Sequence, residues 1–180
     1  EERYNLEDAL VIATMLNSFV NHAHIVKMAN MAQLVNVIAP IFSNETGLFL
    51  QTIYYPLQLF ATHAKGKALD LFIDSPTFES QRLGPVKYLD VSAANDQGSL
   101  VLNVVNRHKD QPLDIEFTLA DSQINGAVEV YEVNGPDIKS ENDFGKTNVR
   151  TVKRSMTASG KTLRYQAPPH SFTLLKARLG

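Results

Sequence analysis

The 180-residue sequence has no cysteine and no tryptophan, and its charge is nearly balanced. The absence of cysteine excludes disulfides, thiolate metal ligands and a cysteine nucleophile, but it does not identify a compartment, because many secreted proteins also lack disulfides. With 17 basic and 19 acidic residues, the chain gives no electrostatic reason to expect nucleic acid or an anionic membrane as a partner. Localisation therefore stays open, and neutral ligands fit the composition better than charged ones.

The sequence also lacks a long apolar run and the common nucleotide and metal motifs. Its longest apolar stretch, Met31 to Phe42, contains two amides and a proline and is too short for the ~20 residues that a membrane helix needs. The segment Ser159–Thr162 resembles the end of a phosphate-binding loop but lacks the first glycine. The histidines are not spaced as metal ligands, and Gly-x-Ser-x-Gly does not occur. The residues therefore predict no membrane helix, no metal site and no serine nucleophile.

The first residues predict a capped helix over positions 5–21. Asn5 is a favourable N-cap, and Asp8 three residues later completes a variant of the capping box. Glu7 and Asp8 are adjacent acids and could form a catalytic pair, but their position in the first turn favours capping instead. Apolar residues then recur at every third or fourth position, so one side of this helix needs a surface to pack against.

Residues 25–66 predict one unit of an α/β fold. Ile25–Asn30 has the pattern of a short strand, and the apolar run after it is typical of a strand buried in a parallel sheet. A polar loop follows at Ser43–Gly47, and Thr52–Ala64 predicts a second helix. Such units build an α/β barrel or a doubly wound sheet, but a single strand cannot close on itself. We therefore expect the apolar faces of both helices to be covered by something outside this chain.

After Gly66 the pattern changes to short strands separated by turns such as Asn125-Gly126 and Ser159-Gly160. Regular short strands of this kind are typical of an antiparallel sandwich, so we place a domain boundary near Gly66. The strand-like segments are Lys67–Asp74, Val86–Ala94, Ser99–Arg107, Leu113–Leu119, Ala127–Val133, Val149–Arg154, Thr162–Tyr165 and Phe172–Ala177.

Six segments of the sequence carry a resemblance to one enzyme family. They are Tyr4–Leu10, Asn30–Ile41, Gln51–Pro56, Tyr88–Ala93, Leu102–Arg107 and Asn134–Ile138. Together they resemble the C-terminal part of the α-L-arabinofuranosidases of glycoside hydrolase family 51. The resemblance covers essentially the whole chain, and since such enzymes are much longer than 180 residues, we expect this chain to be a fragment of one.

The resemblance implies an architecture and an activity. Residues 1–66 would be an α/β barrel fragment, the terminal βα units of a (β/α)8 catalytic barrel, and residues 67–180 an all-β antiparallel sandwich of jelly-roll type. The complete enzyme would release terminal α-L-arabinofuranosyl groups from arabinan or arabinoxylan by a retaining double displacement, which needs two carboxyl groups and no metal or organic cofactor. In the family both glutamates lie upstream of such a chain, so we expect no catalytic residue within it and no activity from it alone.

The same resemblance implies the binding residue and the partners. In the family the glutamine of an Ala-Gln-Leu-Val-Asn segment, here Gln33, binds the arabinofuranosyl ring, and an amide can both donate to and accept from a sugar hydroxyl. The structural alternative for Gln33 is a buried amide that satisfies backbone groups of its loop. Asn30 and Asn36 are predicted to be amides that structure the loop. The expected partners are arabinofuranosyl-containing oligosaccharides or polysaccharides, the missing N-terminal portion of the same enzyme, and further copies in a homo-oligomer.

A second hypothesis belongs to a different class. The chain could be a self-standing sandwich that binds carbohydrate or another protein, with residues 1–66 as a helical adaptor, because sandwich modules of ~110 residues fold alone. Against it, the predicted strands hold no cluster of tryptophans or tyrosines that could form a stacking platform.

Overall fold

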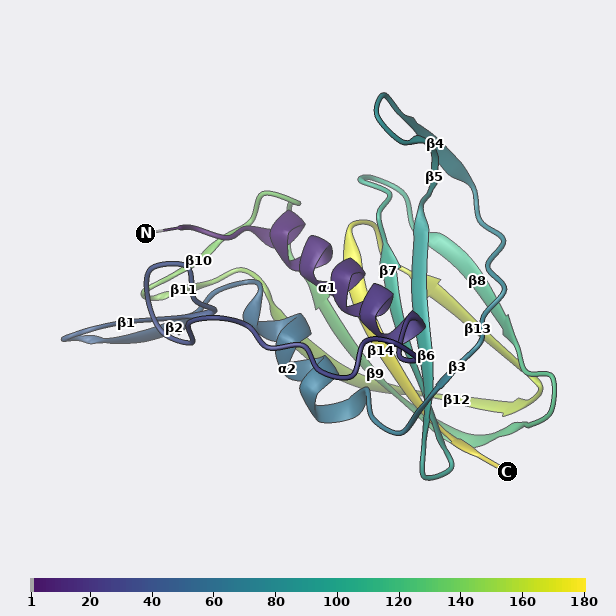
Figure 1. The fold of residues 1–180 in the computed structure, drawn as a ribbon. Coiled ribbons are helices and arrows are strands. Elements are labelled where there is room, and N and C mark those ends of the chain that lie inside the picture. The colour runs from purple at the N-terminus through teal and green to yellow at the C-terminus, as the bar shows by residue number, and fades with distance from the viewer. Residues whose placement is uncertain (1) are drawn as a thin grey trace.

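The computed structural model describes residues 2–180, which form two helices and a mostly antiparallel β structure (Figure 1). The helices are α1 (Leu6–Asn21) and α2 (Tyr54–His63), and neither helix of the described part is long and apolar enough to cross a membrane. The strands are β1 (Ile41–Asn44), β2 (Gly47–Leu50), β3 (Lys67–Leu69), β4 (Thr77–Ser80), β5 (Gly84–Lys87), β6 (Leu89–Asp96), β7 (Ser99–Asn106), β8 (Leu113–Thr118), β9 (Ile124–Asn134), β10 (Asn142–Asp143), β11 (Lys146–Thr147), β12 (Arg150–Gly160), β13 (Thr162–Ala167) and β14 (Ser171–Leu179).

The largest sheet has six antiparallel strands in the order β12-β9-β14-β7-β6-β3. The separate pair β8 and β13 lies over one face of it, and the two layers share a core that includes Val104, Ile115 and Leu163. Most of the predicted strand segments coincide with these strands. Within β7, Val101 and Val105 belong to a second core on the opposite face, so both faces of this sheet are buried. This explains why the β7 sequence is almost continuously apolar instead of alternating.

The two helices cover that second face. Leu6 and Leu10 of α1 and Phe60 of α2 pack against the sheet, where the ring of Phe60 stacks on Phe172 with centroids 5.5 Å apart. The expectation that the apolar faces of both helices are covered from outside the chain is therefore wrong. The sheet needs cover on both faces, and the helices of the same chain supply it for one of them.

The N-terminus of α1 is as predicted. Asn5 Oδ1 accepts a hydrogen bond from the Asp8 N–H at 3.3 Å, and Asp8 Oδ2 accepts one from the Asn5 N–H at 2.8 Å. Glu7 forms an ion pair with Lys139. The capping box is thus confirmed, and both acids have structural partners.

The predicted strand at residues 25–30 and the buried run after it do not form. Residues 25–40 are turns and irregular loop, and Ile25, Met28 and Leu34 are 68%, 79% and 65% exposed. A strand is stable only when a neighbour pairs with its backbone, and within residues 2–180 this segment pairs only through an isolated bridge between Val35 and Ile41. The pattern correctly marks residues that tend to be buried, but the described residues alone do not bury them, and they do not form the predicted barrel unit by themselves.

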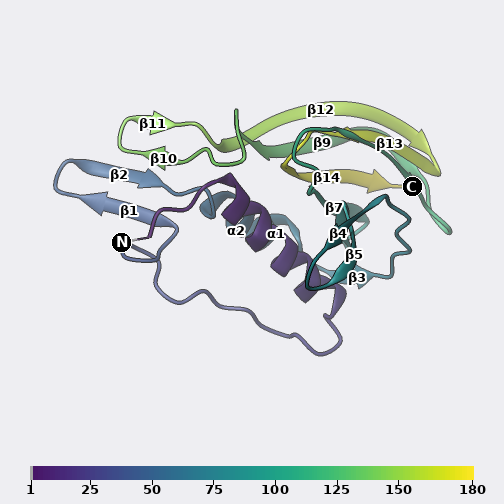
Figure 2. The same cartoon turned by 90° about the horizontal axis from the view of Figure 1, so that it is seen from above.

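Three two-stranded hairpins extend the layered body: β1–β2, β4–β5 and β10–β11. Figures 1 and 2 show β1–β2 and β10–β11 side by side at one end of the molecule, near the N-terminus. The β4–β5 hairpin lies apart from them, at the upper right of Figure 1. The predicted loop at 43–47 is the turn of β1–β2, where Asn44 Oδ1 accepts the N–H groups of Thr46 and Gly47 at 2.8 and 3.1 Å. Its apolar flanks pair as strands, which the sequence analysis missed.

Candidate functional site

Gln33, the predicted sugar-binding residue, lies in the exposed loop between α1 and β1. Its backbone has a φ of 62°, in the left-handed region, and its Nε2 donates to Asn36 O at 3.2 Å and Val35 O at 3.5 Å. The amide therefore bonds its own loop, as the structural alternative predicted, but the side chain is exposed where that alternative required burial. An exposed amide with only local bonds can exchange them for a sugar hydroxyl, so sugar binding by Gln33 stays a prediction.

Asn36 fastens this loop to the first hairpin. Its Oδ1 accepts from the Ser43 N–H at 2.8 Å, and its own N–H donates to Ile41 O at 2.8 Å. The predicted loop-structuring role of Asn36 is confirmed by these bonds. Since Gln33 in turn donates to Asn36 O, the position of the Gln33 side chain depends on where β1 lies.

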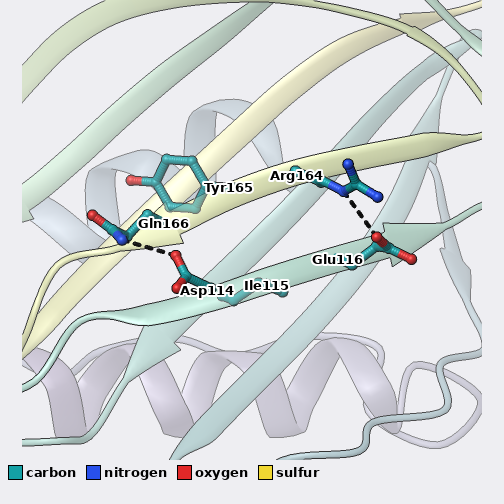
Figure 3. A pocket seen from close by; sticks show the side chains of 6 residues that line it. All are labelled: Asp114, Ile115, Glu116, Arg164, Tyr165 and Gln166. Atoms are coloured by element: carbon teal, nitrogen blue, oxygen red, sulfur yellow. Dashed lines mark hydrogen bonds and ion pairs between the residues drawn. The ribbon is translucent and has the colours of Figure 1, made fainter.

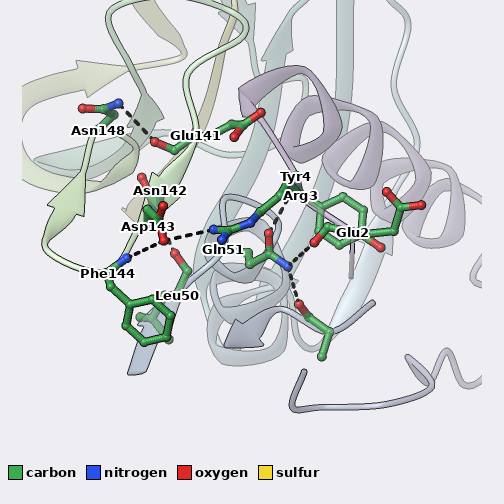
Figure 4. A network of polar contacts seen from close by, with 11 residues as sticks. Glu2, Arg3, Tyr4, Leu50, Gln51, Glu141, Asn142, Asp143, Phe144 and Asn148 are labelled. Carbon is green, nitrogen blue, oxygen red and sulfur yellow. Dashed lines mark hydrogen bonds and ion pairs between the residues drawn. The ribbon is translucent and has the colours of Figure 1, made fainter. Parts of the chain in front are cut away.

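A buried glutamine that the sequence analysis did not single out holds the other side of the loop. Gln51 is 1% exposed; its Nε2 donates to Ala39 O at 2.9 Å and Glu2 O at 3.2 Å, and its Oε1 accepts from the Tyr4 N–H at 3.0 Å (Figure 4). Every amide atom is thus paired, as burial requires. In the sequence, Gln51 is visible only as a polar residue before an apolar helix. That position does not predict its hydrogen-bond partners, Tyr4 and Glu2, which lie 47 and 49 residues away.

The remaining ionisable groups do not gather into a reactive cluster. Within residues 2–180 there is no group of three or more histidine, aspartate or glutamate side chains placed to hold a metal ion. His22 Nδ1 hydrogen-bonds the Ser18 carbonyl at 2.7 Å, and the ring lies 6.0 Å from that of His24, at the end of α1. His170 Nδ1 contacts Lys109 O at 2.5 Å in a turn between strands. His22 and His170 thus bind backbone carbonyl groups of the helix end and of the turn.

An apolar groove of about 930 Å³ lies beside β8, in the second layer of the sandwich. Its floor includes Leu89, Val91 and Leu102 of the large sheet, and its walls are residues 69–76 and 112–122. A smaller hollow of about 380 Å³ lies over β8 and β13, where Gln166 donates to Asp114 at 2.8 Å and Arg164 to Glu116 at 2.9 Å (Figure 3). These polar groups satisfy one another across the strands. Gln33 lines neither hollow.

Comparison with known proteins identifies the family. A family model described as "Alpha-L-arabinofuranosidase C-terminal domain" matches residues 1–171. The chain belongs to this family. A probable alpha-L-arabinofuranosidase C of Aspergillus terreus is 34% identical over 184 aligned positions, and an intracellular exo-alpha-(1->5)-L-arabinofuranosidase 1 of Bacillus subtilis is 33% identical over 152. The alignments cover 98% and 83% of this chain but only 35% and 30% of the relatives, so the arabinofuranosidase C-terminal domain spans about a third of their length.

Solved structures agree with this assignment. A family 51 arabinofuranosidase from Xanthomonas axonopodis pv. citri superposes on 99% of the chain with a TM-score of 0.89 at 25% identity, and the match covers 36% of that protein. The family 51 enzyme AbfB from Bifidobacterium longum gives a TM-score of 0.87 at 27% identity, again over 99% of this chain and 36% of the other. The arabinofuranosidase C-terminal domain is therefore a C-terminal portion of a family 51 protein, as the six sequence segments implied.

Proposed function

We propose that the complete protein is a retaining α-L-arabinofuranosidase that removes terminal α-L-arabinofuranosyl groups from arabinan- or arabinoxylan-type glycans. The observation that carries this proposal is the similarity to arabinofuranosidases along 98% of the chain. The chemistry needs one carboxylic acid and one carboxylate nucleophile about 5 Å apart, without a metal or organic cofactor. The adjacent acids Glu7 and Asp8 are engaged in an ion pair and a cap. The resemblance to family 51 enzymes implies that the catalytic pair lies in the upstream portion of the enzyme.

The domain boundary belongs to the same proposal. Residues 1–66 would be the terminal part of the catalytic barrel, and residues 67–180 a jelly-roll sandwich. In support, the loop at 25–38 exposes a row of apolar side chains, and the outer face of α1 exposes Val11 and Met15 by 53% and 48%. Exposed apolar surface of this extent marks an interface, and the upstream portion of the enzyme is the partner that we propose for it.

Two further features fit a chain that is completed from outside. The apolar groove runs beside β8, whose only described neighbour in its layer is β13. Strands from the upstream portion would complete that layer as a jelly roll.

A homo-oligomer of the complete enzyme is a separate part of the proposal, and light scattering on the complete enzyme would give its mass directly.

The first experiment compares the complete enzyme with the chain of residues 1–180 on an aryl α-L-arabinofuranoside. The complete enzyme should turn over the substrate, while the isolated chain should not, because binding groups without the acid and nucleophile leave both chemical steps uncatalysed. Turnover by the pure 1–180 chain would show that the carboxyl groups are misplaced in this proposal. An inactive complete enzyme would overturn the activity itself.

The second experiment tests Gln33 as the sugar-binding residue. In the complete enzyme, Gln33→Ala should lower kcat/KM by roughly 10- to 200-fold, equivalent to the ~1.5–3 kcal/mol of a lost buried hydrogen bond to the ring. Thermal stability should change little, since the amide bonds only its own exposed loop. Asn30→Ala, three positions upstream, is the matched control: Asn30 is exposed and its side chain makes no hydrogen bond within residues 2–180, in contrast to the loop-structuring role predicted for it, so this variant should keep wild-type kinetics. A Gln33→Ala enzyme that loses stability but keeps its turnover would assign the residue to loop structure.

The alternative of a carbohydrate-binding module finds weaker support. Phe78, Tyr88 and His108 do come together, with ring centroids 5.0 and 4.5 Å apart, but their planes are tilted by 41° and 35°. A tilted cluster does not present the flat face on which a sugar ring stacks. Retention of the 1–180 chain on arabinoxylan would revive this alternative. The whole chain is the appropriate sample, because removing residues 1–66 would uncover the sheet face that α1 and α2 bury.

A further inference from the structure

Two hairpins that are far apart in the sequence are joined beside the loop that carries Gln33. Asn142, at the start of β10, is 3% exposed, and its Nδ2 donates to Leu50 O at the end of β2 at 2.9 Å. The same amide is fixed by Val149, whose O accepts from Nδ2 at 2.8 Å and whose N–H donates to Oδ1 at 2.9 Å. The β10–β11 hairpin therefore sets the position of β1–β2 across 92 residues of sequence.

Arg3 occupies the space between these hairpins. Its Nη1 donates to Asp143 Oδ1 at 3.1 Å (Figure 4). Its guanidinium carbon lies 5.5 Å from the centroid of Phe42 and 5.3 Å from that of Phe49. Phe49 in turn meets Phe144 edge to face at 4.9 Å. We call these five residues the hairpin clamp. The Phe144 N–H and then Arg3 lower the pKa of the Asp143 carboxyl below its usual value, because both donate to the charged form.

The segment that carries Arg3 also holds the loop. The Tyr4 hydroxyl donates to Ile38 O at 3.1 Å, and the Glu2 N–H donates to Val37 O at 2.8 Å. On the opposite side, Asn36 binds the loop to β1. Residues 33–39 are thus held between the segment at 2–4 and the first hairpin, the two elements that Arg3 links.

The loop needs such support because its backbone is strained. Gln33, Asn36 and Val37 have φ values of 62°, 62° and 59°. The left-handed region is unfavourable for side chains with a Cβ, and for the β-branched Val37 most of all. A conformation of this kind persists only where the surroundings fix it.

We propose that the hairpin clamp is a positioning device for the substrate-binding loop, with Arg3 and Asp143 as positioning residues that act through Gln33. This inference rests on the proposed function, in which Gln33 binds the arabinofuranosyl ring. Arg3 touches no substrate in this arrangement. It fixes the first hairpin against the second, and the hairpin fixes the loop.

The test is a double-mutant cycle in the complete enzyme. Arg3→Met keeps most of the apolar stem and removes the cation, and it should lower kcat/KM for an aryl arabinofuranoside about 5- to 30-fold, mainly in kcat, because a small displacement of a binding group is felt most in the transition state. In a Gln33→Ala background the same change should cost less than about twofold, since the group being positioned is already gone. Arg3→Lys, which retains a cation near Asp143 and the rings, should recover most of the activity.

Two controls separate positioning from general damage. Arg164→Met removes an exposed ion pair with Glu116 on the sandwich and should leave the kinetics unchanged. Hydrogen exchange of the amides of residues 33–39 should become faster in Arg3→Met and stay as in the wild type in Arg164→Met. Asp143→Asn is a second, milder variant and should show the same kinetic coupling to Gln33.

The outcomes are distinguishable. Arg3→Met with wild-type kcat/KM, or a loss that simply adds to that of Gln33→Ala, overturns the positioning role while the proposed activity stands. Faster loop exchange without any arabinofuranosidase activity in the complete wild-type protein would leave a structural clamp but remove the proposed function. Coupled losses together with faster exchange support both.

Discussion

The stacked rings of Phe60 and Phe172 offer the sharpest test of whether the helices and the large sheet fold as one unit. Phe60 is 7% exposed and Phe172 is fully buried, and their planes lie within 17° of parallel. A phenylalanine that buries ~200 Å² at about 25 cal/mol per Å² gains about 5 kcal/mol as an upper value. Truncation of buried phenylalanines costs about 3–5 kcal/mol. We therefore expect Phe60→Ala and Phe172→Ala each to lower the free energy of unfolding by about 3–5 kcal/mol.

Urea unfolding of the 180-residue chain measures this. Helix content from circular dichroism and the tyrosine fluorescence of the chain should change in one coincident transition, because both cores share the same sheet. The double mutant should be less destabilised than the sum of the single mutants by about 0.5–1.5 kcal/mol, the coupling of an aromatic pair. Phe72→Ala is the control, since Phe72 is 94% exposed and its removal should change stability by less than about 0.5 kcal/mol.

The result that refutes this reasoning is equally definite. A cost below about 1 kcal/mol for Phe60→Ala would mean that α2 is not packed on the sheet in solution. Helix loss at lower urea than sheet loss would mean that residues 1–66 unfold independently of the sandwich.

Two further predictions concern the junction and pH. Gly66 has a φ of 84°, and a Cβ there would lie 2.2 Å from Asn95 O, so Gly66→Ala should lower the free energy of unfolding by roughly 3 kcal/mol or more. Gly98→Ala is the control, because φ is 80° there but the space is open, and it should cost only about 1–2 kcal/mol. Urea unfolding midpoints of the two variants test this difference. Burial and then Lys176 lower the pKa of His63, whose ring lies 4.7 Å from that of Tyr131. As the pH falls, the unfolded chain therefore binds a proton at this residue before the folded chain does. The free energy of unfolding should decrease as the pH drops below about 6.5. His63→Gln should lack this part of the pH dependence, and a wild-type His63 pKa at or above 6.5 by NMR titration would contradict it.

Short-range features of the sequence predicted the start of the first helix, most strands of the sandwich and the family. The capping box at Asn5 and Asp8 depends on residues three apart, and it predicted the start of α1 correctly. The strands of the sandwich follow from apolar periodicity and turn residues within windows of about ten residues. The six segments that resemble arabinofuranosidases also lie in the sequence itself, and the family assignment needed nothing more.

What the tertiary structure alone decided is which surfaces meet. An apolar pattern says that a side chain tends to be buried but not by what, so the helices were expected to pack outside the chain and instead pack on β7 and β14. Residues 25–30 and the apolar run after them were expected to form a buried strand, but they are turns and loop, because their backbone pairs with a described strand only at the single bridge between Val35 and Ile41. Gln51 and Asn142 look like ordinary polar residues in the sequence, and their roles depend on carbonyl groups up to 92 residues away. Contacts at such separations are set by the topology of the whole fold, and no local window contains both partners.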